Sequence, residues 1–409
     1  MSRAHGDAGA GEDPLLEDGA TDGDETLLDA SAAPATLDDD LTRRLTFRWS
    51  DLPPLTADLP GTGGVLRREH DDFVVRELPL YLPEGSGSHT YVRVEKVGLT
   101  TRDLVTALVQ DGIPERSIGV AGLKDKHART EQWLSVPRRF DGAVDVLERL
   151  VGVSVLEVSR HRNKLGIGHL RGNRFIVVVR GVTPDALERA RAVLAVLAAQ
   201  GTPNYFGPQR FGRFGRNAID GALAVRGTRV PGGRVLTRFF VGALQSQLFN
   251  ALLAERVRDG TFGTVLRGDW ARKHDTGGTF EVDDVALEAP RAAALAISAT
   301  LPLHGTRVRI SAHEAGERER AALADLGLTW EDLAGRRHDV RRTPHAGRRG
   351  DRRISRLVGL EVEVDQDGDA LRLAFDLPKG SYATTVVREI TKVEVDAPEE
   401  TSADEPDAR

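Results

Sequence analysis

Residues 120–133 read VAGLKDKHARTEQW, and within this segment one aspartate, Asp125, lies among four basic side chains on a turn that contains Gly122. Apolar runs at residues 117–120 and 133–136 flank the polar block, and we expect each to form a short buried strand. The block between them is then a loop held at both ends by a sheet. Loops held in this way often carry functional residues, because the sheet fixes their position.

The chemistry of Asp125 has two interpretations. A carboxylate beside several cations stays ionised at neutral pH, where it can act as a nucleophile or a general base. An aspartate in a basic surface loop can equally form a solvated ion pair or cap a turn. This segment alone leaves both interpretations open.

Four more blocks occur elsewhere in the chain. They are DFVVRE at 72–77, GHLRGNRF at 168–175, TPNYFGPQRFG at 202–212 and FDLPKGSYAT at 375–384. With residues 120–133 they resemble, in order, the motifs of the TruD family of RNA pseudouridine synthases. The central block fills every fixed position of that family's A-G-L-K-D-[RK]-x-A-x-T-x-Q-W pattern, and the resemblance covers about residues 60–393.

The resemblance implies that Asp125 is catalytic and that its carboxylate attacks the ribose C1′ or otherwise assists departure of the uracil. It further implies a nucleotide pocket lined by Phe73, Asn204 and Tyr382, with Phe206 as a stacking residue. Phe73 and Phe206 also lie in strand-like runs, where a buried phenylalanine is more often part of the core. Membership of the family favours the pocket for both.

Two basic residues are candidates for charge pairing at this site. Lys124 and Arg210 could contact Asp125 or the phosphates beside a nucleotide that has left its stack. We interpret His127 as incidental, because a single histidine in a basic loop is weak evidence for acid–base chemistry.

The resemblance implies an α+β fold, with a pseudouridine-synthase catalytic domain that has a mixed, largely antiparallel sheet and flanking helices, plus an inserted α/β domain of the TRUD type. Strand-like runs at 73–76, 90–97 and 175–180 accompany helical periodicity at 101–111, 184–199 and 238–258. Thr183 is the expected cap of the second helix. The expected divisions are an acidic tail at 1–42, the catalytic domain at 43–212 and 353–393, the insertion at 213–352 and a second acidic tail at 394–409.

Charge is distributed unevenly along the 409 residues, whose formal net charge is −6. The two tails hold 12 and seven acidic residues with one arginine each, so residues 43–393 carry 54 basic and 43 acidic residues. A basic body suits a protein that binds RNA phosphates. The tails are expected to be disordered and solvated.

Residues 336–356 contain nine arginines and few apolar residues, which predicts a loop. We expect an RNA backbone to meet these guanidinium groups, with Arg348, Arg349, Arg352 and Arg353 among the phosphate contacts.

The chain has no cysteine, which excludes disulfides, thiolate nucleophiles and cysteine-based metal sites. No segment is predicted to cross a membrane or to direct secretion, so we expect a cytoplasmic protein.

The alternatives to a pseudouridine synthase are a non-catalytic RNA-binding protein, a metal-dependent nuclease or nucleotide hydrolase, and an interaction protein without activity. No His-Glu-x-x-His, Walker or paired-carboxylate motif supports the second alternative.

The sequence therefore predicts a tRNA pseudouridine synthase of the TruD type, for which position 13 of tRNA is the family's usual target. We expect tRNA as the partner, and we expect no cofactor, no metal and no obligate protein partner.

Overall fold

The computed structural model describes residues 37–126, 128–334 and 350–395. Its largest element is a nine-stranded sheet with the order β14-β15-β7-β2-β5-β3-β6, in which β1 also pairs with β7 and β4 with β5. The strands are β1 (Val65–Leu66), β2 (Phe73–Pro79), β3 (His89–Val97), β4 (Gly119–Val120), β5 (Arg129–Pro137), β6 (Val153–His161), β7 (Leu170–Arg180), β14 (Val362–Asp367) and β15 (Ala370–Pro378). The β2–β5 pair is parallel, whereas the other pairs described for this sheet are antiparallel. The expected mixed, largely antiparallel sheet is confirmed.

Two groups of helices cover one face of this sheet. Strand residues that lie directly opposite each other point to the same face, so Val75 shares a face with Thr130 on one side and Phe175 on the other. On this face, α2 (Thr101–Gln110) and α3 (Ala143–Glu148) pack on β3 and β5. Helices α4 (Ala186–Gln200) and α10 (Ala383–Thr391) pack on β7 and β15. Strand β2 therefore lies where the two groups meet.

A second unit is inserted between two short strands that pair with each other, β8 (Thr202–Pro203) and β13 (Arg356–Leu357). It contains a four-stranded antiparallel sheet with the order β10-β9-β11-β12. Its strands are β9 (Trp270–Lys273), β10 (Thr279–Glu281), β11 (Ile297–Leu303) and β12 (Asp351–Ile354). Its helices are α5 (Asn217–Val225), α6 (Gly233–Arg258), α7 (Val285–Ala293), α8 (His313–Ala324) and α9 (Trp330–Leu333).

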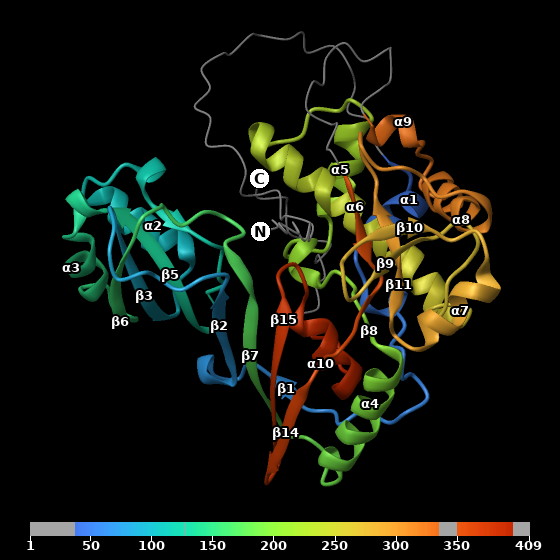
Figure 1. Cartoon of the computed structure of the whole chain (residues 1–409), viewed down its shortest axis with the longest axis horizontal. Coiled ribbons are helices and arrows are strands. Elements are labelled where there is room, and N and C mark those ends of the chain that lie inside the picture. Colours follow the sequence, from blue (N-terminus) through green and yellow to red (C-terminus); the bar gives the residue numbers. More distant parts are fainter. Residues whose placement is uncertain (1–36, 127, 335–349, 396–409) are drawn as a thin grey trace, which may run out of the picture.

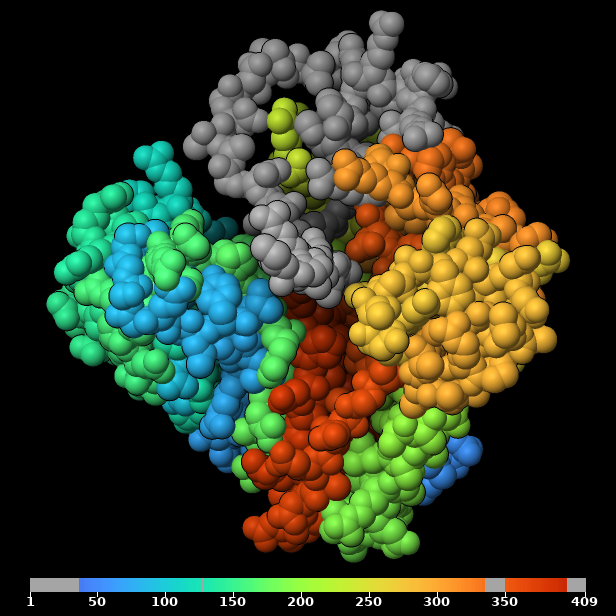
Figure 2. All heavy atoms as spheres, viewed as in Figure 1, coloured from blue at the N-terminus to red at the C-terminus, as the bar shows by residue number. Residues whose placement is uncertain are grey.

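Figure 1 shows the insertion on one side of β7 and β15, and β2, β5, β3 and β6 with α2 and α3 on the other side. The space-filling view in Figure 2 shows the surface hollowed between them, with residues of the C-terminal strands, in red, at the base of the hollow. The site residues expected from the sequence come from both sides of this boundary.

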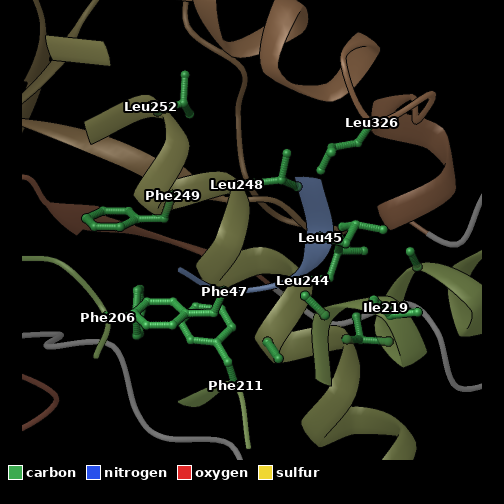
Figure 3. Close-up of a cluster of buried hydrophobic side chains, with 14 of the residues drawn as sticks. Leu45, Phe47, Phe206, Phe211, Ile219, Leu244, Leu248, Phe249, Leu252 and Leu326 are labelled. Carbon is green, nitrogen blue, oxygen red and sulfur yellow. The ribbon is translucent and has the colours of Figure 1, made fainter. Parts of the chain in front are cut away.

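Helix α6 is the centre of the largest hydrophobic core. Its buried face includes Leu244, Leu248 and Phe249, which pack with side chains from α5 and from the N-terminal segment, as Figure 3 shows. Gln245, Ser246 and Asn250 are buried on the same helix, and Asn250 hydrogen-bonds both the backbone N–H and the carbonyl of Phe206. These two bonds give Asn250 a structural role, because they hold the backbone of Phe206 against α6.

The N-terminal segment joins both units. Phe47 stacks on Phe211 with ring centroids 4.7 Å apart. Trp49 donates its indole N–H to the carbonyl of Val395 at 2.8 Å, beyond the end of α10. Arg388 of α10 in turn donates to the carbonyls of Leu52 and Trp49. Residues 45–52 thus belong to the core of the insertion while they are bonded to α10 and Val395 of the unit that contains the nine-stranded sheet.

Two local expectations were wrong. Helix α1 (Asp39–Leu45) includes residues that were assigned to the acidic tail, because Asp38 caps it and its acidic first turn and basic last turn match the helix dipole. Helix α4 begins at Ala186 after Asp185, without a side-chain cap; Thr183 instead accepts a turn bond through its carbonyl.

The arginine-rich segment was also partly misjudged. Residues 351–354 form β12, which pairs with β11, and residues 356–357 form β13. Arginines are compatible with these strands because their guanidinium groups find carbonyl and carboxylate acceptors nearby. Residues 335–349 lie outside the described residues, as do 1–36 and 396–409.

Candidate active site

The loop that carries Asp125 leaves the sheet because β2 and β4 both pair with the same edge of β5. Strand β2 pairs with the first half of β5, up to Glu131, and β4 pairs with the second half, at Leu134 and Ser135. The two strands approach β5 from opposite directions and meet near Trp133, whose backbone N–H lies 3.4 Å from a carboxylate oxygen of Glu77 on β2. The chain that leaves β4 therefore passes out of the sheet before it returns as β5.

Lys124 anchors this loop on the helix-covered face. Its backbone N–H donates to the hydroxyl of Thr101 at 2.7 Å, and its ammonium donates to Asn173 Oδ1 at 2.9 Å. The ammonium also lies 3.4 Å from Glu77 Oε2, and the side chains of both partners are almost fully buried. Burial raises the pKa of Glu77, while the Lys124 charge acts in the opposite direction.

Lys96 holds the loop at the next residue. Its ammonium donates to the carbonyl of Asp125 at 2.9 Å and to the carbonyl of Leu99 at 2.5 Å. The side chain is buried, and burial lowers the pKa of Lys96 to about 8, against the attraction of the Asp125 charge. The contacts of the Lys96 ammonium, from β3, and of the Lys124 ammonium, from the loop itself, thus restrain the chain on both sides of the Asp125 α-carbon.

The Asp125 residue itself is exposed. Neither anchoring contact uses its carboxylate, so the group stays available to a substrate. Nearby in sequence, His127 lies outside the described residues.

Phe73 lies on the same sheet face, at the start of β2, and is only 4 % exposed. The guanidinium carbon of Arg67 lies 4.1 Å from the centre of its ring, and the backbone of Arg67 has a left-handed φ of 56°. A non-glycine residue in this region is strained, which is frequent at functional sites. Asp72, next to Phe73, is held by a bidentate contact from Arg180.

The second group of expected site residues surrounds Arg353. This guanidinium donates to Asn204 Oδ1 at 2.6 Å and to the carbonyl of Gly380 at 2.8 Å. Its central carbon lies 4.2 Å from the centre of the Phe206 ring, which in turn contacts the Tyr382 ring edge-on at 5.7 Å. Burial lowers the pKa of Arg353 to about 10, so it stays charged at neutral pH.

Strands β7 and β15 connect the two groups. Asn173, which binds Lys124, lies directly opposite Leu377 in the ladder. Beyond Leu377 the chain reaches Ser381, whose hydroxyl donates to Asn204 Oδ1 at 3.2 Å. The structure therefore places the Asp125 loop and the Asn204 cluster at the same end of this strand pair.

The remaining expected contacts are placed differently. Arg210 is buried and donates to Ser246 of α6 at 3.1 Å, so its described contacts lie within the insertion. Arg352 donates to Glu319, Ser311 and the carbonyl of Thr300 in the same unit. Arg348 and Arg349 lie outside the described residues.

Sequence reasoning missed Lys96 and the pairing of Lys124 with Glu77. A signal was present, since Val92, Val94 and Lys96 alternate along one strand and must share its buried face. The same alternation along β2 puts Glu77 on the face that Phe73 and Val75 share. A charged residue on a buried strand face requires a partner, and this requirement could have led to both residues.

Within the described ranges, no three histidine, aspartate or glutamate side chains gather as metal ligands. Of the helices in that part of the chain, none combines the length and apolar character that a membrane crossing requires.

Comparison with known proteins finds relatives over most of the chain. The family model for tRNA pseudouridine synthase D (TruD) matches residues 51–227 and 230–390. A tRNA pseudouridine synthase D from Anaeromyxobacter dehalogenans is 48% identical over 358 residues, covering 86% of this chain and 99% of the relative. The Thermus thermophilus protein of the same name is 46% identical over 351 residues, covering 86% and 95% of the two chains.

A solved structure assigned to tRNA pseudouridine synthase D (TruD) of Methanosarcina mazei has the same fold. It superposes with a TM-score of 0.67 at 24% identity and covers 87% of this chain and 98% of its own. The expected α+β fold class is confirmed by this likeness.

Proposed function

The chain belongs to the TruD family of tRNA pseudouridine synthases; its reaction is the isomerisation of uridine to pseudouridine in tRNA, and we propose that Asp125 supplies the carboxylate for it. The reaction breaks the bond from ribose C1′ to uracil N1, turns the freed base and joins C5 to C1′. C5 loses a proton and N1 gains one, so no cofactor is consumed. The carboxylate either adds to C1′ or assists departure of the base.

The observation that supports Asp125 most directly is the way it is held. Its carboxylate is exposed, whereas its carbonyl is bonded by the buried ammonium of Lys96 and the preceding residue by Glu77 and Asn173. A reactive group fixed by its backbone needs little reorganisation to reach a bound sugar. A carboxylate in a solvated surface ion pair would not require two buried cations beneath it.

For the nucleotide pocket we propose Phe73, Asn204, Phe206 and Tyr382. Among these, Tyr382 is partly exposed at the start of α10, so its ring is best placed to stack on a base. Asn204 and Phe206 are 3 % and 7 % exposed and shape the wall behind that ring. A uridine must leave its stack to enter such a pocket.

We further propose position 13 of tRNA as the target and the basic body of the chain as the RNA-binding surface, with the insertion contributing to it. Electrostatic contact with phosphates would make binding strongly dependent on salt.

The test is pseudouridine mapping by selective chemical labelling and reverse transcription. Unmodified tRNA is incubated with the wild-type protein or with Asp125→Asn, without added metal or cofactor. We expect a new pseudouridine at one position with the wild type only. A modification of equal extent with Asp125→Asn would reject Asp125, and a modification at another position would reject position 13.

A further inference from the structure

The side chain of Glu77 is buried beneath the loop that carries Asp125. We propose that Glu77 is a positioning residue for Asp125, and that it acts by holding the ammonium of Lys124 in place. This inference rests on the proposed role of Asp125. It concerns the support of the carboxylate rather than contact with the RNA, since the Glu77 side chain is only 2% exposed.

The first step of the argument is the location of the Lys124 ammonium. Glu77 on β2 and Asn173 on β7 lie directly opposite each other in the sheet, and the ammonium lies between them. It donates to Asn173 Oδ1 at 2.9 Å and forms an ion pair with Glu77 Oε2 at 3.4 Å. One side chain of the loop is thereby tied to two adjacent strands of the central sheet.

The second step is the spacing of the anchors. Lys124 directly precedes Asp125, and the carbonyl of Asp125 is bonded by Lys96 from β3. The two contacts restrain the chain before and after the Asp125 α-carbon, so the direction of the carboxylate depends on both. With Asn173 alone, the buried ammonium would keep one neutral acceptor and lose the charge that offsets its desolvation.

The third step is that Glu77 has little other use in the structure. Its Oε1 makes a single long bond, at 3.4 Å, to the N–H of Trp133. Its Oε2 forms no hydrogen bond among the described residues, so its main partner is the Lys124 charge. A buried carboxylate is costly, and burial raises its pKa accordingly. An acid placed here only for stability would be expected to have better hydrogen bonds.

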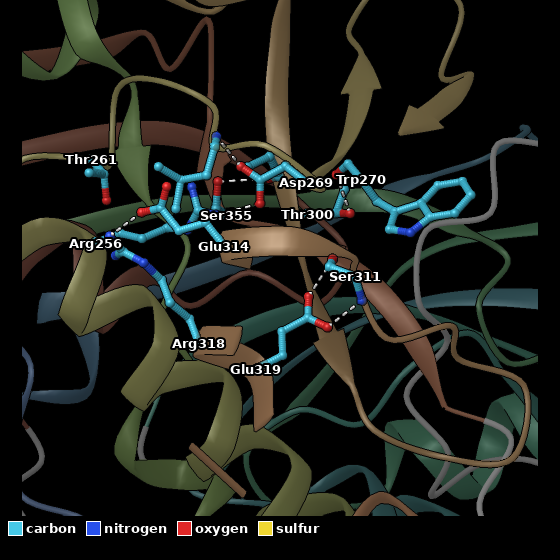
Figure 4. Close-up of polar contacts among 12 residues, drawn as sticks. Arg256, Thr261, Asp269, Trp270, Thr300, Ser311, Glu314, Arg318, Glu319 and Ser355 are labelled. Carbon is cyan, nitrogen blue, oxygen red and sulfur yellow. Dashed lines mark hydrogen bonds and ion pairs between the residues drawn. The ribbon is translucent and has the colours of Figure 1, made fainter. Parts of the chain in front are cut away.

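The experiment compares Glu77→Gln with a matched variant, Asp269→Asn. Asp269 forms a buried ion pair with Arg256 in the insertion, shown in Figure 4, and its other oxygen accepts the N–H of Leu266. Both variants replace a buried carboxylate by its isosteric amide and leave a buried cation unpaired. We expect both to lower the Tm, and we compare activities at a temperature where all variants are folded.

For Glu77→Gln we expect kcat to fall about 10- to 100-fold while KM for tRNA changes less than about threefold, because small displacements of a reacting group cost this much. Asp269→Asn is expected to keep the wild-type kcat. Amide hydrogen exchange should be faster in peptides covering residues 120–126 of Glu77→Gln and unchanged there in Asp269→Asn. Wild-type kcat and wild-type exchange in Glu77→Gln would overturn the inference.

A double variant, Glu77→Gln with Lys124→Met, separates positioning from stability. Removing both charges together avoids a buried unpaired ion, so the Tm should recover toward the wild type. We expect kcat to stay low, because the tie to β2 and β7 is still missing. Recovery of kcat along with the Tm would overturn the positioning role. If the wild type itself showed no turnover, the proposed function would fail, and the exchange measurement would still decide the inference.

Discussion

The loop around Asp125 and the turn that carries Asn204 and Phe206 are both held by cations, but the cations contact different atoms. Lys96 binds the carbonyl of Asp125, and Lys124, the preceding residue, binds Asn173 and Glu77, so neither contact uses the Asp125 carboxylate. Arg353 instead binds the side-chain oxygen of Asn204 and lies over the ring of Phe206. The proposed reactive residue is therefore exposed, whereas the proposed recognition residues are engaged inside the protein.

The difference follows from the two kinds of side chain. An ammonium is a compact charge whose three donors leave one nitrogen, so Lys96 bonds two nearby carbonyls, while a planar guanidinium can bond acceptors that lie on different segments of the chain. Arg353 bonds Asn204 and Gly380 together, and so fixes the turn before Tyr382 relative to the insertion. A nucleotide bound by Asn204, as we propose, would therefore compete with Arg353, whereas Asp125 is exposed.

The largest effect should come from removing the exposed charge. Asp125→Asn is expected to lower turnover by at least about 10³-fold, because the amide cannot act as a nucleophile, while tRNA affinity changes little. Single-turnover assays and filter binding measure the two quantities. A variant that kept turnover within tenfold of the wild type would remove the contrast between the two regions.

The next largest effect concerns the guanidinium of Arg353. Arg353→Lys keeps the charge but cannot bridge Asn204 and Gly380, so we expect kcat/KM to fall about 10- to 100-fold. Arg43→Lys, on the exposed surface of α1, is the matched control and should be neutral. Equal activity of the two variants would show that charge alone suffices at Arg353.

Lys96 should produce a distinctive pH dependence. The pKa of Lys96 is about 8 in the folded protein, so its hydrogen bond to the carbonyl of Asp125 should weaken as the pH rises through this value. We expect activity to decline several-fold above pH 8 in the wild type, and Lys96→Met to be less active but to lack this decline. The charges nearest Lys96 are those of Asp125, Lys124 and Asp103.

Stability should change in the opposite direction in the same experiment. The Lys96 pKa is lowered from 10.5, so the cost of burying the charged form is fully present below pH 8 and is relieved between pH 8 and 10.5. Relative to Lys96→Met, the wild type should gain stability over this interval while it loses activity. A parallel decline of both would point to general alkaline unfolding.

The smallest effects on activity are expected in the arginine-rich segment. Arg352→Ala should cost about 3 kcal/mol of stability, because it leaves the buried Glu319 unpaired, and should not change the salt dependence of binding. The double change of Arg348 and Arg349 to Ala should leave the Tm unchanged and lower the salt slope by up to about 2. An unaltered slope would exclude these two arginines from the RNA interface.

Much of this architecture could be predicted from the sequence. Strand parity and helical periodicity gave α2 and β3 within one residue, but β2 and β7 are longer than expected by three and five residues, because Glu77 and Asn173 interrupt their apolar faces. The fold class and reaction followed from the five motif blocks rather than from periodicity. Arg352 and Arg353 could not be assigned in this way, since an arginine on a surface loop and one bonded within a fold have the same local sequence.

The support of the site was also only partly visible. The resemblance names Asp125 but gives no reason for its position, which depends on Lys96, Glu77 and Asn173 from three different strands. Such contacts join residues that are far apart in the chain, so they require the sheet order to be known. The N-terminal boundary failed for a local reason, because Asp38 caps a helix at Asp39–Leu45 that begins inside the expected tail. The contacts of residues 45–52 with partners beyond residue 200 likewise require the fold to be known.

That N-terminal segment has a consequence for synthesis on the ribosome. The indole of Trp49 bonds the carbonyl of Val395, and the two are separated by 346 residues. Nearly the whole chain must leave the ribosome before this bond can form, and Phe47 and Leu45 stay without their core until the insertion has been made. Contacts of such long range slow folding and keep apolar surface exposed to other chains in the meantime.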